Sequence, residues 1–459
     1  MSKAPRASIR RIVPRSLLRL LLAAAVLHVV LVIAIALLGN SRALPQTFDT
    51  LGVGTSFAID TGVYRTEAEK MARLMQQGRF PEWWNYAARL RSSAHVRPYS
   101  IAFALLGPVA GYRMLAAEPV NLGYYLAILV LTFAIGAELF DRRTGLVAAS
   151  IVGLWPSLLL YTTQMLRDPL AIFATLLLVL CLVFSIRRSL SLIQAGALAA
   201  TGAFALLLLW LCKAETWELI YLILFLAAAF CGIGQIKERH LALGRTVSMI
   251  ALLLFAFSLP RALPMFRLGD LADGGTMTGA TQAANDRLTD AVPSSAGSSP
   301  WARIVRQVAF LRHRFIVRYP TAGSNVDTDV ELRGAGDMLR YFPRAVAIGF
   351  FAPFPNMWFA RGVHTGIAGR LLTGGETLIM YLIIALMAIG LARHRRNVLV
   401  WFLFTTAAAG CIALAYVVVN ISSLYRMRYP FFILVVILGA AGAVSLWERQ
   451  LSRGSLQAA

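Results

Sequence analysis

Long apolar runs separated by short clusters of arginine constrain the fold of this chain more than any other feature. Several runs of about 18 or more apolar residues follow one another, and each is long enough to cross the bilayer core as a helix. Charged residues make up 14% of the chain, whereas soluble proteins carry about 25%. The sequence therefore predicts one all-α polytopic membrane protein, not the two or three soluble domains that 459 residues would otherwise suggest.

The formal net charge of +22 does not indicate nucleic-acid binding. The arginines are concentrated between the apolar runs, where they orient a membrane protein, and no basic stripe with interleaved aromatic residues is present. The cysteines form no CxxC pair, and all of them lie within or beside apolar runs: Cys181, Cys212, Cys231 and Cys411. We expect buried thiols here, not a metal centre or a disulfide framework.

The first apolar run, Leu17 to Leu38, follows a basic segment and resembles the start of a signal peptide. It is long enough to span the membrane, and no clean A-x-A cleavage site follows it. We interpret it as a signal anchor that stays in place. Because the preceding residues include five basic side chains, the positive-inside rule predicts a cytosolic N-terminus.

The later arginine clusters fit the same rule if two segments do not cross the membrane. Tyr99–Ala117 is interrupted by Gly107-Pro108, and Phe342–Phe359 contains three prolines, so both are expected to be juxtamembrane segments on the outer surface. The prediction is then about ten transmembrane helices in a bacterial inner membrane, with both termini cytosolic. The clusters expected inside are 141–143, 187–188, 237–240, 393–396 and 448–453.

This topology divides the chain into five parts. They are a cytosolic N-terminus (1–16), an N-terminal transmembrane module (17–263) with a first external loop (40–121), a long external loop (264–375) with the juxtamembrane segment 342–359, C-terminal transmembrane helices (376–447) and a cytosolic tail (448–459). The Gly-, Ala-, Ser- and Thr-rich stretch 269–300 is predicted to be a mobile or lid-like loop.

Several charged residues fall on the predicted external face. Asp60 precedes Tyr64, Ala68 and Ala72, and this spacing places the three on one helical face. From this pattern alone Asp60 is either a helix N-cap or a catalytic carboxylate, or both. Glu67 lies on the same predicted helix.

Three further turns on this face carry charge. Arg167-Asp168 ends an apolar run, where an ionisable pair is either interfacial or functional. Lys213, Glu215 and Glu218 mark the next turn, and a solvated turn is the simpler interpretation of them. In the last turn Arg426 and Arg428 break the orientation rule, and guanidinium groups there suit phosphate, either of lipid headgroups or of a lipid-linked substrate.

The long external loop carries His313, His364 and five arginines, several of which share a helical face: Arg303, Arg306, Arg312, Arg314 and Arg318. The sequence contains no H-E-x-x-H, G-x-S-x-G, P-loop or dinucleotide-binding motif. The spans are expected to be nearly free of ionisable residues, which argues against a transporter, since transporters carry such groups near mid-membrane.

In these features the chain resembles the GT-C superfamily of membrane glycosyltransferases, in the bacterial branch akin to protein O-mannosyltransferases and aminoarabinose transferases. The resemblance rests on the D-x-x-x-Y-x-x-x-A-x-x-x-A pattern from Asp60, on Arg97-Pro98 before a juxtamembrane helix, and on Trp155-Pro156-Ser157 leading to Arg167-Asp168. Segments 352–355 and 420–430 look like exopolysaccharide-locus members of this group.

The resemblance implies a GT-C-like bundle with external juxtamembrane helices. It also implies an inverting enzyme that transfers a sugar from a polyprenyl-phosphate donor to a glycan, lipid or protein acceptor on the periplasmic face. Asp60 would be the base and Asp168 the second acidic group, while Arg167, Arg426 and Arg428 would hold the donor phosphate. Tyr64 and Glu67 are assigned to acceptor binding. A divalent metal, Mg or Mn, is a possible cofactor of such enzymes.

Two alternatives from other classes stay open. A polysaccharide polymerase or O-antigen ligase would rest on the long loop, with Arg312, Arg314, Arg318 and His364 in place of Asp60. The other alternative is a non-enzymatic transporter of a lipid-linked glycan.

Overall fold

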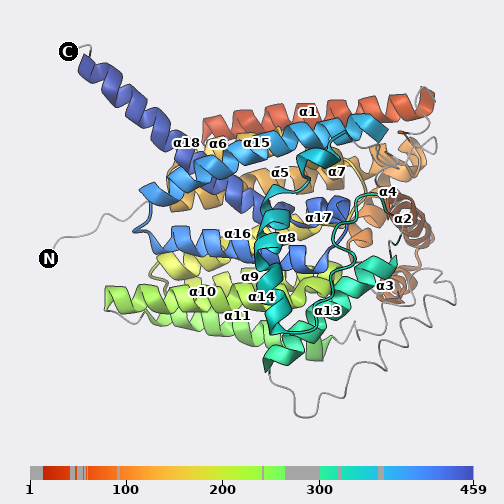
Figure 1. Cartoon of the computed structure of the whole chain (residues 1–459). Coiled ribbons are helices and arrows are strands. Elements are labelled where there is room, and N and C mark those ends of the chain that lie inside the picture. Colours follow the sequence, from red (N-terminus) through yellow and green to blue (C-terminus); the bar gives the residue numbers. More distant parts are fainter. Residues whose placement is uncertain are drawn as a thin grey trace.

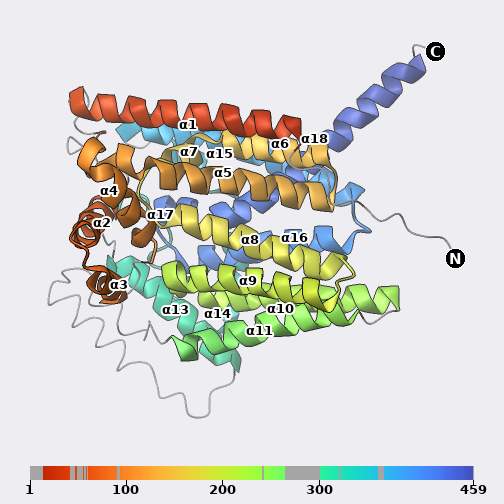
Figure 2. The same cartoon turned by 180° about the vertical axis from the view of Figure 1, so that it is seen from behind.

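The structure, a computed structural model, describes residues 14–41, 47, 48, 55, 58, 60–89, 94–239, 242–263, 300–318, 320, 322–359 and 366–457. In this part of the chain, long helices lie side by side as a bundle, and shorter helices gather at one end of it (Figures 1 and 2). The predicted mobile loop 269–300 lies outside the described residues, except that Pro300 begins a helix.

The helices follow the predicted runs in order. Those of the N-terminal half are α1 (Arg15–Ser41), α2 (Asp60–Gln76), α3 (Phe80–Arg89), α4 (Val96–Ala110), α5 (Met114–Leu139), α6 (Arg142–Gly153), α7 (Pro156–Thr162), α8 (Asp168–Arg187), α9 (Leu192–Lys213), the 3-10 turn η1 (Ala214–Thr216), α10 (Trp217–Glu238) and α11 (Leu243–Ala262). Those of the C-terminal half are α13 (Pro300–Arg318), α14 (Ala335–Phe351), η3 (Pro355–Met357), α15 (Gly366–Arg393), α16 (Val398–Val417), α17 (Ile421–Met427) and α18 (Tyr429–Gln457).

Eight helices of the described chain are long and apolar enough to cross a membrane, or nine if the bent pair α6–α7 forms one span. One of the eight, Leu192–Glu238, has 47 residues, which is about 70 Å of helix against a hydrocarbon core of about 30 Å. It comprises α9 and α10, and both pack against α8 and α11, so the chain doubles back at η1. If α6–α7 is counted as one span and α9 and α10 as two, the described chain has the ten spans that were predicted. This is an all-α polytopic membrane protein.

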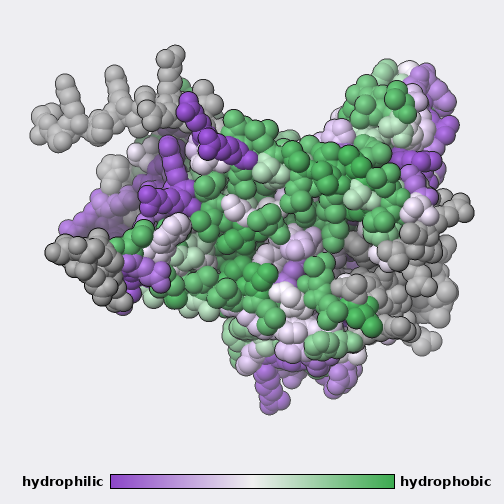
Figure 3. Space-filling model, turned by 90° about the horizontal axis from the view of Figure 1, so that it is seen from above, coloured by the Kyte–Doolittle hydropathy of each residue, from purple (hydrophilic) through white to green (hydrophobic). Residues whose placement is uncertain are grey.

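The surface has the polarity that a membrane protein needs. Hydrophobic side chains cover most of the middle of the face in Figure 3, and hydrophilic ones gather mainly toward its two ends. The helices α2, α3 and α4 lie at one end, and α18 projects beyond the other (Figure 1). Because α8 begins at Asp168 and ends at Arg187, the pair Arg187-Arg188 lies at the end of the bundle opposite to Asp168.

Neither of the two predicted surface segments is among the candidate spans. Gly111, with a φ of +74°, ends α4 after Ala110, so the segment predicted as Tyr99–Ala117 is divided between α4 and the start of α5. The segment Phe342–Phe359 forms the end of α14 and the short η3. The apolar run that ends before Arg167-Asp168 is not a straight continuation of α6, because the chain bends by 68° between α6 and α7, where Pro156 begins α7.

The centre of the bundle is α18, which packs against α15, α16, α6, α5 and α8. Its contact with α15 depends on small residues. A Cβ atom at Gly442 would overlap the carbonyl group of Leu386, and one at Gly390 would overlap that of Leu438. Close approach at small residues is a common way for helices to associate within a membrane. The tight α15–α18 pair supports both short helices that face the site, α7 and α17.

Cysteine labelling can measure on which side of the membrane each end of the helix bundle lies. All four native cysteines are buried, so they form a silent background. We expect a membrane-impermeant maleimide applied to spheroplasts to label Lys70→Cys in α2 and to leave Arg395→Cys, between α15 and α16, unlabelled until the membrane is permeabilised. Labelling of both positions before permeabilisation, or of Arg395→Cys alone, would contradict an external α2.

Candidate functional site

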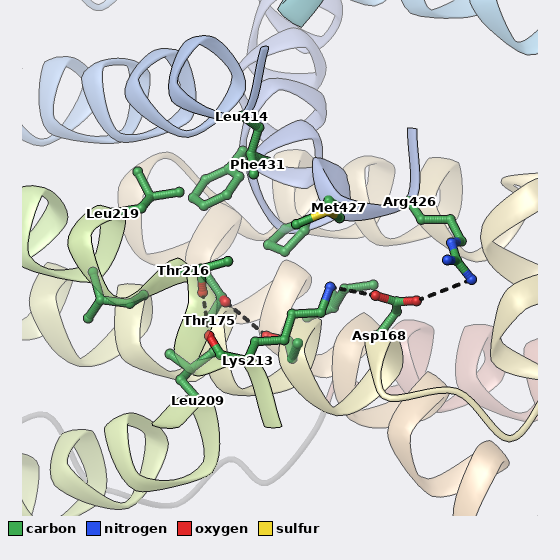
Figure 4. Close-up of a pocket in the computed structure, with 14 residues that line it drawn as sticks. Asp168, Thr175, Leu209, Lys213, Thr216, Leu219, Leu414, Arg426, Met427 and Phe431 are labelled. Carbon is green, nitrogen blue, oxygen red and sulfur yellow. Dashed lines mark hydrogen bonds and ion pairs between the residues drawn. The ribbon is translucent and has the colours of Figure 1, made fainter. Parts of the chain in front are cut away.

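A cluster of charged side chains lies where α8, α9 and α17 meet (Figure 4). Asp168, at the first position of α8, is 7% exposed, and one of its carboxylate oxygens accepts a hydrogen bond from Lys213 Nζ at 2.6 Å. Its other oxygen lies 3.8 Å from the guanidinium group of Arg426. The buried carboxylate is therefore compensated by two cations, as a charge withdrawn from water requires.

Asp60 completes the cluster from outside the bundle. It begins α2, and Ala68 and Ala72 of that helix pack against α4, as the four-residue spacing predicted. The Asp60 carboxylate lies 3.6 Å from the Arg426 guanidinium, and its side chain remains 48% exposed. Arg426 therefore lies between one accessible and one buried carboxylate.

The contacts of Arg426 are looser than those of its neighbours. Charge-assisted hydrogen bonds between nitrogen and oxygen measure about 2.7–2.9 Å, and both of its carboxylate contacts are longer. Its guanidinium also faces the ring of Tyr161 at 5.8 Å. Burial alone lowers the pKa of Arg426, but Asp168, Tyr161 and Asp60 together raise it above its ordinary value, so it stays charged.

Two further predicted residues border this cluster. Arg167 pairs with Glu215 at 2.9 Å and also donates to the carbonyl of Cys212. Tyr64 packs edge-on against His95. Burial raises the pKa of the Tyr64 hydroxyl to about 12, although the positive charge of Arg167 acts to lower it. Tyr64 is therefore a neutral hydroxyl at physiological pH.

A pocket opens from the charged cluster into the bundle (Figure 4). Asp168, Lys213 and Arg426 line one part of it, and the rest is lined mainly by apolar side chains of α8, α9, α10, α16 and α18, including Leu209, Leu219, Leu414 and Phe431. The cavity is narrow, with a volume of about 30 Å³. A site that is charged at one end and apolar along its walls suits an amphipathic ligand.

A buried hydrogen-bond network lies beside Arg426 and fixes the helix that carries it. Glu376 of α15 accepts from the hydroxyl of Tyr425 at 2.6 Å and from the backbone N–H and hydroxyl of Ser157 at 2.5 and 2.6 Å. Tyr429 contacts the same hydroxyl of Ser157. The network joins α7, which carries Tyr161, to α17, which carries Arg426. Since these helices have only seven residues each, Glu376 fixes their relative position.

The structure does not bring two of the predicted residues into the cluster. Arg428 is 2% exposed, and its guanidinium donates to the carbonyls of Gly349 and Ala352, which tie α17 to the end of α14. Glu67 accepts from Tyr86 and Lys70 on the α2–α3 side.

The arginines of the long loop lie on α13. Arg312 is 3% exposed and donates to three backbone carbonyls, those of Asp327, Val330 and Tyr416. Its guanidinium is thus engaged in holding α13 to α16 and to the segment before α14. His364 and the side chain of Arg318 lie outside the described residues.

One expectation from the sequence is wrong. The spans were expected to be nearly free of ionisable groups, yet His28 in the middle of α1 is fully buried and pairs with Glu118 of α5 at 2.7 Å. The other ring nitrogen of His28 lies 3.2 Å from the hydroxyl of Thr162, and its ring stacks on Tyr125. Single polar residues within apolar runs are easily overlooked when a span is judged by its mean hydropathy.

The described residues do not fit a bound divalent metal in this arrangement. No group of three or more His, Cys, Asp or Glu side chains within them could hold one. Both carboxylate oxygens of Asp168 already face cations.

No family model and no curated protein matches the chain. Among solved structures, it is similar to the archaeal oligosaccharyltransferase AglB from Archaeoglobus fulgidus, in complex with an inhibitory peptide and a dolichol-phosphate. The TM-score is 0.42 and the identity 12%, over 80% of this chain and 43% of that one. The chain thus spans less than half the length of that protein, and the likeness is too low to support an argument.

Proposed function

We propose that this protein is a membrane glycosyltransferase that transfers a sugar from a polyprenyl-phosphate donor to a hydroxyl acceptor on the periplasmic face. One observation carries the proposal. Arg426 lies loosely between the accessible carboxylate of Asp60 and the buried carboxylate of Asp168, at the mouth of a pocket with apolar walls. A phosphate-bearing lipid and an attacking hydroxyl can meet there.

In this mechanism the donor phosphate binds beside Arg426 and Lys213, and the lipid chain enters by parting the apolar side chains that line the narrow pocket. Phosphate oxygens offer a guanidinium shorter and better aligned hydrogen bonds than Asp60 does. Arg426 then turns from Asp60 to the phosphate, and the Asp60 carboxylate becomes free. Asp168 holds both cations in place and stays ionised between them.

The chemical step is a single displacement. Asp60 takes the proton of the acceptor hydroxyl as its oxygen attacks the anomeric carbon. The bond from that carbon to the phosphate oxygen breaks, and the bonding electrons leave with the polyprenyl phosphate. Arg426 and Lys213, with Arg167 nearby, stabilise the charge that develops on this leaving group. Attack from the face opposite the phosphate inverts the anomeric configuration.

A reconstituted assay tests this function. The purified chain in proteoliposomes is supplied with a panel of polyprenyl-phosphate sugars, radiolabelled in the sugar, together with a cell-envelope extract as acceptor. We expect the label to leave one donor of the panel while free polyprenyl phosphate accumulates. Intact donor crossing the bilayer without cleavage would instead show a transporter, and products of joined repeating units would show a polymerase.

A transporter is the second candidate. Spans without ionisable groups would argue against a transporter, but the buried His28–Glu118 pair places such groups within the spans. The polymerase or ligase is less favoured. It requires Arg312 to be available to substrate, and that guanidinium is engaged by backbone carbonyls.

A further inference from the structure

At the end of the bundle opposite to the charged cluster lies a second, larger hollow. Its volume is about 870 Å³. The end of α8 lines it, and α8 packs against both α5 and α9 (Figure 2). Glu138 of α5 lines one side, and one face of α9 lines the other.

Two arginines with exposed guanidinium groups line this hollow. The side chains of Arg187 and Arg188 are 46% and 54% exposed. Both pair with the single carboxylate of Glu138, Arg188 closely at 2.6 Å and Arg187 at 3.7 Å. Two cations therefore share one anion, and the three side chains together carry one uncompensated positive charge.

The backbone that carries these arginines is held firmly. Arg245 of α11, itself 5% exposed, donates to the carbonyl oxygens of Arg187 and Arg188 at 3.0 and 3.1 Å. A Cβ atom at Gly244 would overlap the carbonyl group of Leu190, so glycine is needed for α11 to pack this closely. The guanidinium groups are thus presented from a fixed turn.

Part of the lining of the hollow is apolar. Gln194, Ala197, Leu198 and Thr201 recur at the spacing of one helical face along α9. The hydroxyl of Thr201 donates a hydrogen bond to the carbonyl of Ala197, so the methyl group of Thr201 can face the hollow. Phe184 of α8 also lines the hollow and lies 4.2 Å below the guanidinium of Arg188.

From this arrangement we propose that the hollow between α5, α8 and α9 binds an anionic phospholipid, with its phosphate on Arg187 and Arg188 and an acyl chain along α9. Guanidinium groups grip phosphate oxygens with paired hydrogen bonds, and basic pockets between transmembrane helices at the membrane surface suit anionic headgroups. The uncompensated charge favours an anionic lipid over a zwitterionic one. The proposal is independent of the function of the Asp168 cluster.

Native mass spectrometry of the full chain in detergent tests this site with phosphatidylglycerol and phosphatidylcholine as probes. For Arg187→Gln/Arg188→Gln we expect phosphatidylglycerol affinity to fall by about tenfold or more, and phosphatidylcholine binding to be unchanged. The matched control, Arg395→Gln/Arg396→Gln, removes the same charge from another exposed turn and is expected to retain wild-type affinity. Equal losses in both double variants would overturn the proposal, since general electrostatics would then explain the binding.

A second variant leaves the charges in place. Ala197→Trp fills the exposed face of α9 beside the hollow and is expected to weaken phosphatidylglycerol binding, because the acyl chain loses its place. Its unfolding temperature, compared with the wild type, verifies that it folds. Wild-type phosphatidylglycerol affinity in a folded Ala197→Trp, or displacement of the lipid by excess inorganic phosphate alone, would overturn the lipid site in favour of a site for small anions.

Discussion

Replacing Asp60 with asparagine is expected to lower the turnover number of sugar transfer by roughly 10²- to 10⁴-fold, the usual contribution of a general base. The amide keeps the size of the side chain and can still accept a hydrogen bond from Arg426, but it cannot take a proton from the acceptor. Because Asp60 is about half exposed, little folding energy should depend on its charge. Initial rates in the reconstituted assay, at saturating donor, measure the effect.

The matched control is Glu69→Gln on the same helix. Glu69 pairs with Arg65 and Arg73 on α2 and does not contact the cluster. We expect this variant to transfer sugar at the wild-type rate. If Asp60→Asn also kept its turnover, Asp60 would not be the base, and another group would have to accept the proton.

Replacing Arg426 with glutamine is expected to have a second large effect, a loss of about 10²- to 10³-fold in turnover, together with weaker donor binding. The guanidinium is the only group of the described cluster placed between Asp60 and Asp168, so its removal takes away the phosphate contact and leaves both carboxylates less compensated. Arg426→Lys keeps the charge but loses the planar fork, and it should recover only part of the activity.

Arg344→Gln provides the control for Arg426. Arg344 also pairs with an aspartate, Asp327, at 2.8 Å, but on α14 and away from the cluster. Transfer rates and the dependence of rate on donor concentration separate the two cases. A normal apparent donor affinity in Arg426→Gln would contradict a phosphate contact at this residue, even if turnover fell.

The order of spans and the shared end of Asp60, Arg167, Asp168 and Arg426 could be predicted from the sequence. Both follow from the alternation of apolar runs and arginine clusters, which assigns each turn to one side of a membrane. Residues in successive turns on one side can only be a few helix diameters apart. In the structure Arg426 lies within 4 Å of both Asp60 and Asp168.

The partners of these residues could not be predicted in the same way. Lys213 was interpreted as part of a solvated turn, yet it forms the closest contact of Asp168. Glu376 stands at the predicted border of a span, and only the packing of α15 against α18 brings it to Tyr425. Charge pattern gives the side of the membrane on which a residue lies, whereas tertiary packing decides which groups it meets.

The two arginines of the last turn show the same limit. Arg426 and Arg428 differ by two positions, so they point to different sides of a short helical segment. One faces the pocket, and the other is buried against the carbonyls at the end of α14. A role in phosphate binding was predicted for both, and the structure places only Arg426 where a ligand could reach it directly.

The position of the donor phosphate tests the central claim most directly. A cryo-EM structure of the wild-type chain, with a polyprenyl-phosphate sugar bound in lipid nanodiscs, would show it. We predict phosphate density within hydrogen-bonding distance of Arg426 and Lys213, with the lipid chain in the pocket between α8, α10 and α18. Phosphate density beside α13, with the Asp60–Arg426–Asp168 cluster unchanged and empty of ligand, would contradict the account.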